Sequence, residues 1–380
     1  MLRDAHILPN TPVLVRAGLN APIEHGRVAN DYRLRRALPT LMYLSNIGAR
    51  VIVISHIGEE GTETLAPIAA ALGSLISNVT FFPESIGLHV RDAIRNMAPG
   101  HILVLENLRR NPGEVGNDEA FAKELASLAD FFIQDAFDTC HRKHASIVGV
   151  PQFLPSYMGL LVEEEIAELN GALRPTAPSL AVIGGAKFST KEPVLTALLK
   201  KYDHVFVGGA LANDFTKASG VEVGRSLVSN ADQAGITKLL THPRLVIPVD
   251  FLVAMGEERR DQARVALPGD IHPNEIILDH GPGTAALLQE LAVHAKTVLW
   301  NGPVGKYENG FTDGTNAFAR AVATSSARSV IGGGDTIAAI EQLGLLSKFS
   351  FVSTGGGSML DFLAKGTLPG IEVLEPHANA

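Results

Sequence analysis

The chain has 380 residues, 46% of them hydrophobic, and this length and composition predict two globular domains and exclude wholesale disorder. The net charge of -8 argues against nucleic acid or an acidic membrane surface as a partner. The single cysteine, Cys140, excludes an internal disulfide and a Cys/His zinc site. There is no signal-peptide pattern and no apolar run long enough to span a bilayer, so we expect a cytoplasmic protein.

Short apolar runs rich in β-branched residues alternate with helix-like segments along nearly the whole chain. This alternation is typical of parallel α/β architecture. In the first half we predict strands at 13–16, 50–55, 102–106 and 131–136. In the second half we predict strands at 180–185, 204–209, 244–250, 297–302, 329–334 and 349–357.

The residues that follow these strands differ between the two halves, and ligands of open α/β sheets bind at the carboxyl ends of strands. Polar and cationic side chains follow the first-half strands: Arg16, Asn20, His56, Asn107, Arg109 and Arg142. Glycine-rich loops follow the second-half strands: 184–187, 208–210, 301–305, 332–335 and 354–357. One glycine pair can be a plain turn and one arginine can be idle, but five such loops favour close backbone approach to phosphate.

The common nucleotide-binding motifs are missing from this glycine-rich half. The sequence has no G-x-x-x-x-G-K-[ST] motif and no G-x-G-x-x-G after a strand. A glycine-rich domain beside a cationic domain instead fits phosphoryl transfer, which needs positioning, charge neutralisation and exclusion of water. Closure of two domains would supply all three.

Long ordered motifs identify a family that the chain resembles from end to end, the phosphoglycerate kinases. The motifs are "NDYRLRRALPT" (30–40), "SHIG" (55–58), "LENLR" (105–109), "DAFDTCHRKHAS" (135–146), "GGAKFSTK" (184–191), "WNGPVGKYE" (300–308), "GGGDTIAAIEQLG" (332–344) and "STGGGSMLDFL" (353–363). The resemblance implies two doubly wound parallel-sheet α/β domains joined by a long helix. We therefore expect an acid-substrate domain at 1–154, an inter-domain helix at 155–173 and a nucleotide-binding domain at 174–380.

The resemblance also implies a function: phosphoryl transfer between ATP and the carboxylate of 3-phosphoglycerate, with Mg²⁺, in glycolysis. The partners are then a small carboxylate and an adenine nucleotide, held on opposite walls of a closing cleft, and the protein is a monomer. The implied nucleotide-binding residues are Gly185, Lys187, Lys191, Glu308, Gly333, Gly334, Asp335 and Thr336, with Asp335 as the metal ligand. The implied catalytic residues are Arg33, Lys187, Lys191, Gly333 and Gly356.

On the acid-substrate side, the positions that match the family's binding residues include several changes. The matching positions are Gly18, Leu19, Asn20, Arg33, His56, Ile57, Gly58, Glu59, Arg109 and Arg142. Gly18 stands where the family has an aspartate that contacts the glycerate, and Glu59 stands where an arginine contacts the remote phosphate. Asp138 replaces a glycine, and in the other domain Thr190 replaces an aspartate.

These changes leave three hypotheses open, because losing one charge-assisted phosphate contact costs about 1.5–3 kcal/mol. The first is ordinary phosphoglycerate kinase activity, in which Arg110 or Lys143 compensates, or Glu59 points to solvent and binding merely weakens. The second is a relative that phosphorylates a different small carboxylate. The third is a non-catalytic homologue that still binds nucleotide.

Overall fold

The computed structural model describes residues 1–229, 233–257 and 260–374, and the chain divides into two compact units. The first unit comprises Met1–Ala167 and Thr367–Ala380, and the second comprises Glu168–Gly366. This division differs from the predicted boundaries, because residues 367–374 group with the first unit. There the Gly370 amide donates to the Cys140 carbonyl at 2.8 Å. A short terminal helix carries no sequence signal for the segment on which it packs, here the helical turn Ala145–Gly149.

The first unit is built on a six-stranded sheet of order β5-β6-β4-β1-β7-β8, in which every neighbouring pair is parallel. The strands are β1 (Pro12–Ala17), β4 (Arg50–Ile54), β5 (Val79–Phe81), β6 (Ile102–Val104), β7 (Phe131–Asp135) and β8 (Ser156–Met158). The four predicted strands of this half are present. The edge strands β5 and β8 were not predicted, because their short sequences, VTF and SYM, are not continuous apolar runs.

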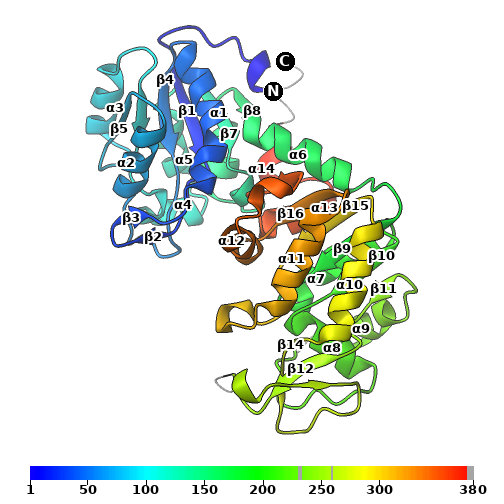
Figure 1. Ribbon diagram of the computed structural model, residues 1–380. Coiled ribbons are helices and arrows are strands. Elements are labelled where there is room, and N and C mark those ends of the chain that lie inside the picture. The colour runs from blue at the N-terminus through cyan, green and yellow to red at the C-terminus, as the bar shows by residue number, and fades with distance from the viewer. Residues whose placement is uncertain (230–232, 258–259, 375–380) are drawn as a thin grey trace. The chain divides into compact units, whose positions relative to one another are not determined.

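Both faces of this sheet are buried, as its uninterrupted apolar strands require. Val13 and Val15 belong to one core cluster, together with Leu34 and Leu41 of α1, whereas Leu14 belongs to a second cluster on the opposite face. The helices of the unit are α1 (Tyr32–Asn46), α2 (Ala66–Leu75), α3 (Leu88–Arg95), α4 (Pro112–Val115), α5 (Glu119–Ala126) and α14 (Pro369–Glu372). The sheet with its helices on both faces is visible in Figure 1.

The long helix predicted at 155–173 begins later than expected. Residues Ser156–Met158 form β8, and helix α6 spans Leu160–Ala172. Two side chains from elsewhere fix this start: Thr40 Oγ1 accepts from the Leu160 amide and Asp135 Oδ1 from the Leu161 amide, both at 3.0 Å. Burial raises the pKa of Asp135 to about 7. Pro155 therefore introduces a strand, and the sequence could not show which side chains satisfy the first turn of the helix.

The second unit also has a six-stranded parallel sheet, of order β11-β10-β9-β15-β16-β17. Its strands are β9 (Ser179–Ile183), β10 (His204–Val207), β11 (Leu245–Val246), β15 (Thr297–Asn301), β16 (Arg328–Gly332) and β17 (Phe351–Val352). Each coincides with a predicted run. The helices are α7 (Phe188–Leu199), α8 (Ala210–Ala218), α9 (Gln233–Leu240), α10 (Pro282–His294), α11 (Asp313–Thr324), α12 (Gly334–Gln342) and α13 (Gly357–Lys365). Helix α7 packs against α13, and α10 packs against α11 (Figure 1).

Two antiparallel elements were not predicted. The second unit contains a three-stranded sheet of order β13-β12-β14, formed by β12 (Phe251–Ala254), β13 (Arg264–Ala266) and β14 (Ile276–His280). The first unit contains a hairpin of β2 (Ile23–Glu24) and β3 (Arg27–Val28). No helix within the described parts of the chain is long and apolar enough to cross a membrane.

Candidate functional site

The cationic side chains of the first unit lie at the carboxyl ends of its central strands, where α/β sheets bind ligands. Arg16 is the next-to-last residue of β1 and is buried. Its guanidinium donates to the Ala17 carbonyl at 2.6 Å and to Ser146 Oγ at 3.0 Å, and Ser146 in turn donates to Glu114 at 2.6 Å. A buried charge needs such partners. Arg16 is therefore held rigidly and acts on its neighbours as a fixed positive charge.

His56 is the second residue after the end of β4, and its side chain is held as a neutral imidazole. Burial and then the charges of Arg16, Arg109, Arg142 and Arg33 place the pKa of His56 well below its usual value. An Arg16 guanidinium nitrogen lies 2.9 Å from His56 Nδ1. Since arginine can only donate, Nδ1 accepts and the ring proton is on Nε2. His56 therefore offers one N–H donor to an acidic ligand without adding charge.

Two asparagines shape the loop after His56. Asn20 Oδ1 accepts from the Gly58 amide at 3.2 Å, and Asn107 Oδ1 accepts from the amides of Ile57 and Arg109 at 3.2 and 3.1 Å. Leu19 is buried, and its amide donates to Ser55 Oγ at 3.2 Å. The structure thus brings together the predicted residues 18–20, 56–59 and Arg109. Asn107 organises this loop, and the sequence had marked it only as a polar residue after a strand.

Glu59, the acid that replaces a family arginine, contacts two of the retained arginines. Its Oε2 lies 2.8 Å from Arg109 Nη1 and 3.8 Å from Arg142 Nη1. The Arg109 side chain is only 2% exposed, whereas that of Glu59 is 72% exposed. The Arg109 guanidinium also donates to the Gly58 carbonyl. Glu59 therefore supplies an anion to the arginines from the solvent side, where a carboxylate can move away at little cost.

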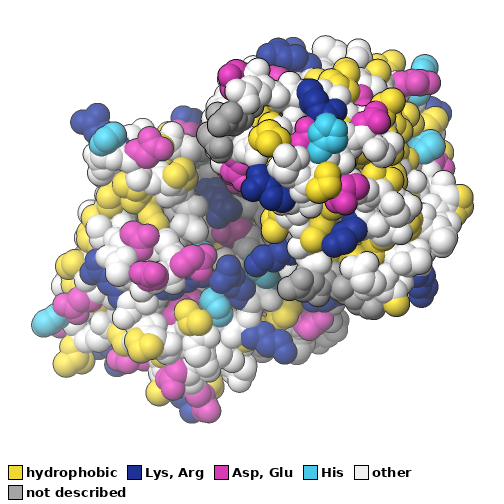
Figure 2. Space-filling view, turned by 90° about the horizontal axis from the view of Figure 1, so that it is seen from below, with side chains coloured by type: hydrophobic (Ala, Val, Ile, Leu, Met, Phe, Trp, Pro, Cys, Tyr) yellow, Lys and Arg dark blue, Asp and Glu magenta, His cyan; other side chains and the backbone are white. Residues whose placement is uncertain are grey.

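Arg110 does not compensate for Glu59 in this structure. It pairs with Glu106 at 3.3 Å, and Glu106 also accepts from the Leu65 amide at 2.9 Å. Lys143, the other candidate, is exposed. The two hypothesised compensating cations are therefore not seen to pair with the new acids. On the face shown in Figure 2, basic and acidic side chains are interspersed.

Arg33 is paired with the third changed residue, Asp138. Arg33 lies in the first turn of α1, and its Nη1 is 2.6 Å from Asp138 Oδ2. The Arg33 side chain is 28% exposed and that of Asp138 only 6%. The arginine expected to act in catalysis is thus anchored by a buried carboxylate while part of its side chain remains exposed.

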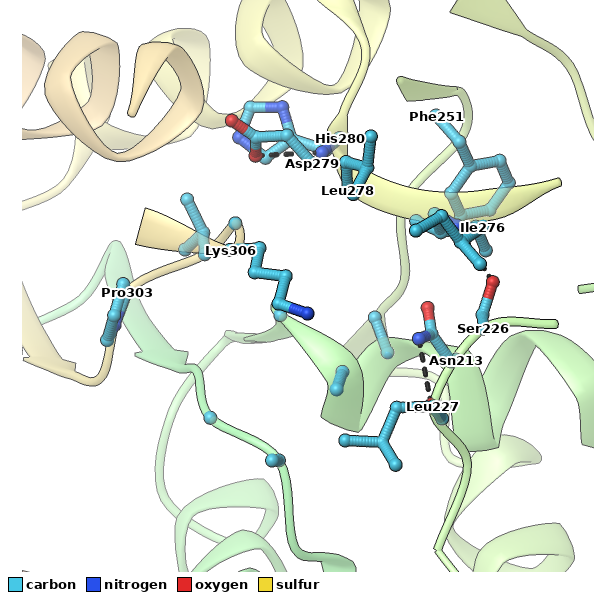
Figure 3. A pocket seen from close by; sticks show the side chains of 18 of the residues that line it. Asn213, Ser226, Leu227, Phe251, Ile276, Leu278, Asp279, His280, Pro303 and Lys306 are labelled. Carbon is cyan, nitrogen blue, oxygen red and sulfur yellow. Dashed lines mark hydrogen bonds between the residues drawn. The ribbon is translucent and has the colours of Figure 1, made fainter. Parts of the chain in front are cut away.

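The second unit contains a cavity of about 640 Å³ lined by its glycine loops and by the antiparallel sheet. Figure 3 shows Leu278, Asp279 and His280 on one wall, with Asn213, Ser226 and Leu227 opposite. Lys306 extends between these two walls. This volume suits a nucleotide-sized ligand, and a largely apolar lining with a few polar groups is typical of small-molecule sites.

Three of the predicted nucleotide-binding residues line this cavity: Gly185, Glu308 and Asp335. The other predicted residues are not part of its lining, namely Lys187, Lys191, Gly333, Gly334, Thr336 and Gly356. They follow the carboxyl ends of β9, β16 and β17 in the same sheet. The structure therefore places Gly185, Glu308 and Asp335 at the cavity, and the other predicted residues along the adjoining strand ends.

The glycine loops approach one another so closely that side chains would not fit. A Cβ atom added at Gly302 would lie 2.6 Å from the Gly184 carbonyl oxygen, and one added at Gly208 would lie 2.9 Å from the Val304 Cβ. Gly333 has a φ of +98°, a conformation that favours glycine, and Thr336 Oγ1 accepts from the Gly302 amide at 2.9 Å. The sheet edge is therefore lined by backbone, with little space for side chains.

The two predicted lysines flank this edge and differ in exposure. Lys187 is exposed, and its carbonyl accepts from the hydroxyl of Thr190 at 2.9 Å. Lys191 lies over Gly185: a Cβ atom added there would be 3.9 Å from Lys191 Nζ. Burial lowers the pKa of Lys191 to about 8. Thr190, where the family has an aspartate, thus completes the first turn of α7 and leaves Lys191 with a carboxylate only on its other side in sequence, that of Glu192.

The sequence did not identify the wall of the cavity formed by β12 and β14. Ile276, Leu278, Asp279 and His280 come from β14, and Phe251 comes from β12. Nor did it assign a role to Lys306, which pairs with Glu257 at the cavity. Lys306 lies within the motif WNGPVGKYE (300–308), and membership of this motif was the only signal in the sequence for a role of Lys306. The antiparallel strands β12 and β14 begin with short apolar runs, FLVA and IIL, which were not identified as strands.

Fold and site together define a class: a two-unit parallel α/β protein with a cationic site in one unit and a glycine-lined nucleotide-type cavity in the other. Comparison with known proteins makes this specific. The phosphoglycerate kinase family model matches residues 2–366. The phosphoglycerate kinase of Roseiflexus sp. is 41% identical over 377 residues, covering 95% of both chains.

Solved structures agree with the sequence comparison. The phosphoglycerate kinase from Coxiella burnetii is 38% identical with a TM-score of 0.83, covering 99% of this chain and 98% of its own. That from Pyrococcus horikoshii is 31% identical with a TM-score of 0.87, covering 100% and 99%. The chain belongs to the phosphoglycerate kinase family.

Proposed function

We propose that this chain transfers a phosphoryl group between ATP and the carboxylate of 3-phosphoglycerate, forming the acyl phosphate 1,3-bisphosphoglycerate and ADP. The observation that carries the proposal is the combination, in one family member, of a buried arginine and histidine cluster with a glycine-lined cavity. Phosphoryl transfer is catalysed mainly by positioning and by neutralising charge, and these two sites offer both.

In the first unit, the acid substrate binds at the cationic cluster. Arg109 and Arg142 bind the remote phosphate and Glu59 swings away to solvent, since its side chain is 72% exposed. His56 donates from Nε2, and Asn20 keeps the Gly58 loop in position. Arg33 is the cation that stabilises charge developing between the carboxylate and the transferring group.

In the second unit, the nucleotide binds in the cavity with its phosphates toward the glycine loops. Glu308 lines the cavity and accepts from ribose hydroxyls, and the backbone at Gly185, Gly333 and Gly356 donates to phosphate oxygens. Lys187 and Lys191 add positive charge along the same strand ends. With its pKa near 8, Lys191 is mostly a cation at neutral pH and gains further from a bound phosphate.

The residues at the cavity fit a magnesium ion that travels with the nucleotide. Asp335 is exposed at the cavity, while the described residues contain no group of three His, Cys, Asp or Glu side chains that could hold a metal by themselves. Mg²⁺ bound with nucleotides takes one or two carboxylates, with phosphates and water as its other ligands. Asp335 would hold this ion, which neutralises charge on the phosphates.

The changed acid site motivates a second candidate, a kinase for another small carboxylate. Glu59 on the arginines suits a substrate that lacks the remote phosphate or carries a donor group there. The third hypothesis, a non-catalytic nucleotide-binding homologue, does not explain why Arg33, Lys187 and Lys191 are all kept. We further infer a protein of the cytoplasm, from the missing signal-peptide pattern, and a monomer, as the resemblance implies; light scattering after gel filtration tests the monomer.

Activity on a panel of acids separates these candidates. The purified chain is incubated with Mg²⁺, ATP and either 3-phosphoglycerate, glycerate or another hydroxy acid. ADP is measured by a coupled assay and acyl phosphate by trapping with hydroxylamine. We expect hydroxamate and ADP in equal amounts with 3-phosphoglycerate. Product from a different acid alone would establish the second candidate, and nucleotide binding in calorimetry without any product would establish the third.

A further inference from the structure

Gly18 and Asp138, two of the changed residues, lie against each other in space. They follow β1 and β7, which are parallel neighbours with Ala17 opposite Asp135. A Cβ atom added at Gly18 would lie 2.5 Å from Asp138 Oδ1 and 3.1 Å from its Cγ. The Asp138 carboxylate therefore fills the space that a side chain at position 18 would occupy. The chain has thus lost the family's aspartate at position 18 and gained Asp138, whose carboxylate lies in the same space.

The Asp138 carboxylate has one oxygen in use and one available. Oδ2 accepts from Arg33 Nη1 at 2.6 Å, whereas Oδ1 is buried and has no hydrogen-bond partner among the described residues. The side chain is only 6% exposed, so bulk water does not compensate freely. A buried carboxylate oxygen without a donor is costly, and in native proteins it usually awaits a ligand or an ordered water.

We propose that Asp138 binds a hydroxyl group of the acid substrate through Oδ1, and so selects an acid that carries a hydroxyl beside its carboxylate. This inference rests on the proposed function and names the determinant of its substrate class. An ionised carboxylate only accepts hydrogen bonds, so it favours a hydroxyl donor and disfavours a second anionic group at that point. Arg33 holds the other oxygen, which fixes the direction of Oδ1. Gly18 is required because any side chain there would displace the carboxylate.

A pair of substrates distinguishes hydroxyl binding from mere support of Arg33. The probes are 3-phosphoglycerate and 3-phosphooxypropanoate, which has the same carboxylate and phosphate but lacks the 2-hydroxyl. In the unsubstituted chain we expect kcat/KM for the deoxy acid to be about 10- to 100-fold lower. Asp138→Ala should lower kcat/KM for 3-phosphoglycerate by a similar factor and leave the deoxy acid within about threefold. Asp130→Ala, an exposed aspartate just before β7, is the matched control and should change neither.

An equal loss on both acids in Asp138→Ala would overturn the proposal, because Asp138 would then act only through Arg33. Equal use of both acids by the unsubstituted chain would also overturn it. Should Asp138→Ala unfold, the double exchange Gly18→Asp with Asp138→Gly decides: preference for the hydroxylated acid must return in it. Gly18→Asp alone, which places two carboxylates in one space, must bind worse.

Calorimetric binding of the two acids keeps this test separate from the proposed function. If no acid is phosphorylated, the proposed function fails, yet a 10- to 100-fold tighter binding of 3-phosphoglycerate that Asp138→Ala abolishes still supports hydroxyl recognition. Equal binding of the two acids in calorimetry would overturn it.

Discussion

The two units solve the problem of binding an anion in different ways. The second unit presents glycine loops, and close backbone contacts at some of them, such as Gly208 and Gly302, leave no room for a side chain. The first unit presents arginines, and each of Arg33, Arg109 and Arg142 lies beside a carboxylate of the chain itself. A backbone site depends on conformation, so it changes little unless a glycine is lost. A side-chain site can be adjusted residue by residue, and the altered positions of this chain gather mainly there.

The comparison predicts the largest loss when the cation nearest the chemistry is removed from the first unit. Arg33→Ala should lower kcat about 100- to 1,000-fold, because one group that stabilises developing charge is lost. The KM for ATP should stay within about twofold, as measured in steady-state assays. Arg35→Ala is the matched control: it lies on the same helix, is exposed and pairs with Asp31, and should leave kcat unchanged. Full kcat in the Arg33→Ala variant would contradict a catalytic role for the first unit.

In the second unit, substitution of Lys191 should change both kcat and the pH dependence of kcat/KM. Lys191→Ala should lower kcat about 100-fold. Because burial lowers its pKa to about 8, the lysine loses its proton as pH rises through this value, and kcat/KM for ATP should fall above about pH 8. Lys191→Arg keeps its charge and should abolish that fall. A pH profile identical in the original chain and in Lys191→Arg would show that another group titrates; exposed Lys200→Ala is the control.

Adding one methyl group to a glycine loop tests whether the nucleotide site is truly a backbone site. Gly333→Ala, at a φ of +98°, should weaken ADP binding about 10-fold in calorimetry and cost about 1 kcal/mol of stability. Gly220→Ala has a φ of +87° and open space around it, and lies outside the cavity lining. It should lose similar stability without losing ADP affinity. Equal affinity loss in both variants would mean that strain alone weakens binding.

The smallest effect should come from the acid on the rim of the first unit. Glu59→Gln removes the carboxylate that competes with the substrate phosphate for Arg109, so the KM for 3-phosphoglycerate should fall about two- to fivefold. The KM for ATP should not change. Its neighbour Glu60 is also exposed, and Glu60→Gln serves as the control. A rise in the KM for 3-phosphoglycerate in Glu59→Gln would indicate that Glu59 helps binding.

The sequence predicted the parallel strands because strands buried on both faces are read as continuous apolar runs, as "RVIVI" of β4 illustrates. It missed the sheet of β12, β13 and β14, whose residues line the cavity, and it started helix α6 too early. These features depend on neighbours that are distant in sequence. The start of α6, for example, is set by Thr40 and Asp135.

For the acid site, the sequence identified the altered positions but not how they are related. It treated Gly18 and Asp138 as two separate defects, although the adjacency of β1 and β7 brings them into contact. It likewise proposed Arg110 as a compensating cation, whereas Arg110 pairs with Glu106. Whether a charge compensates another depends on side-chain direction, which no spacing pattern contains.

The most direct test of the central claim is the ratio of kcat/KM for 3-phosphoglycerate to that for glycerate, measured at saturating Mg²⁺ and ATP. If Arg109 and Arg142 still receive the remote phosphate despite Glu59, the phosphorylated acid should be preferred at least about 100-fold, the value of one strong charge-assisted contact. Glycerate used as well as 3-phosphoglycerate would contradict the account, because the arginine cluster would then be fully satisfied by the chain's own carboxylate.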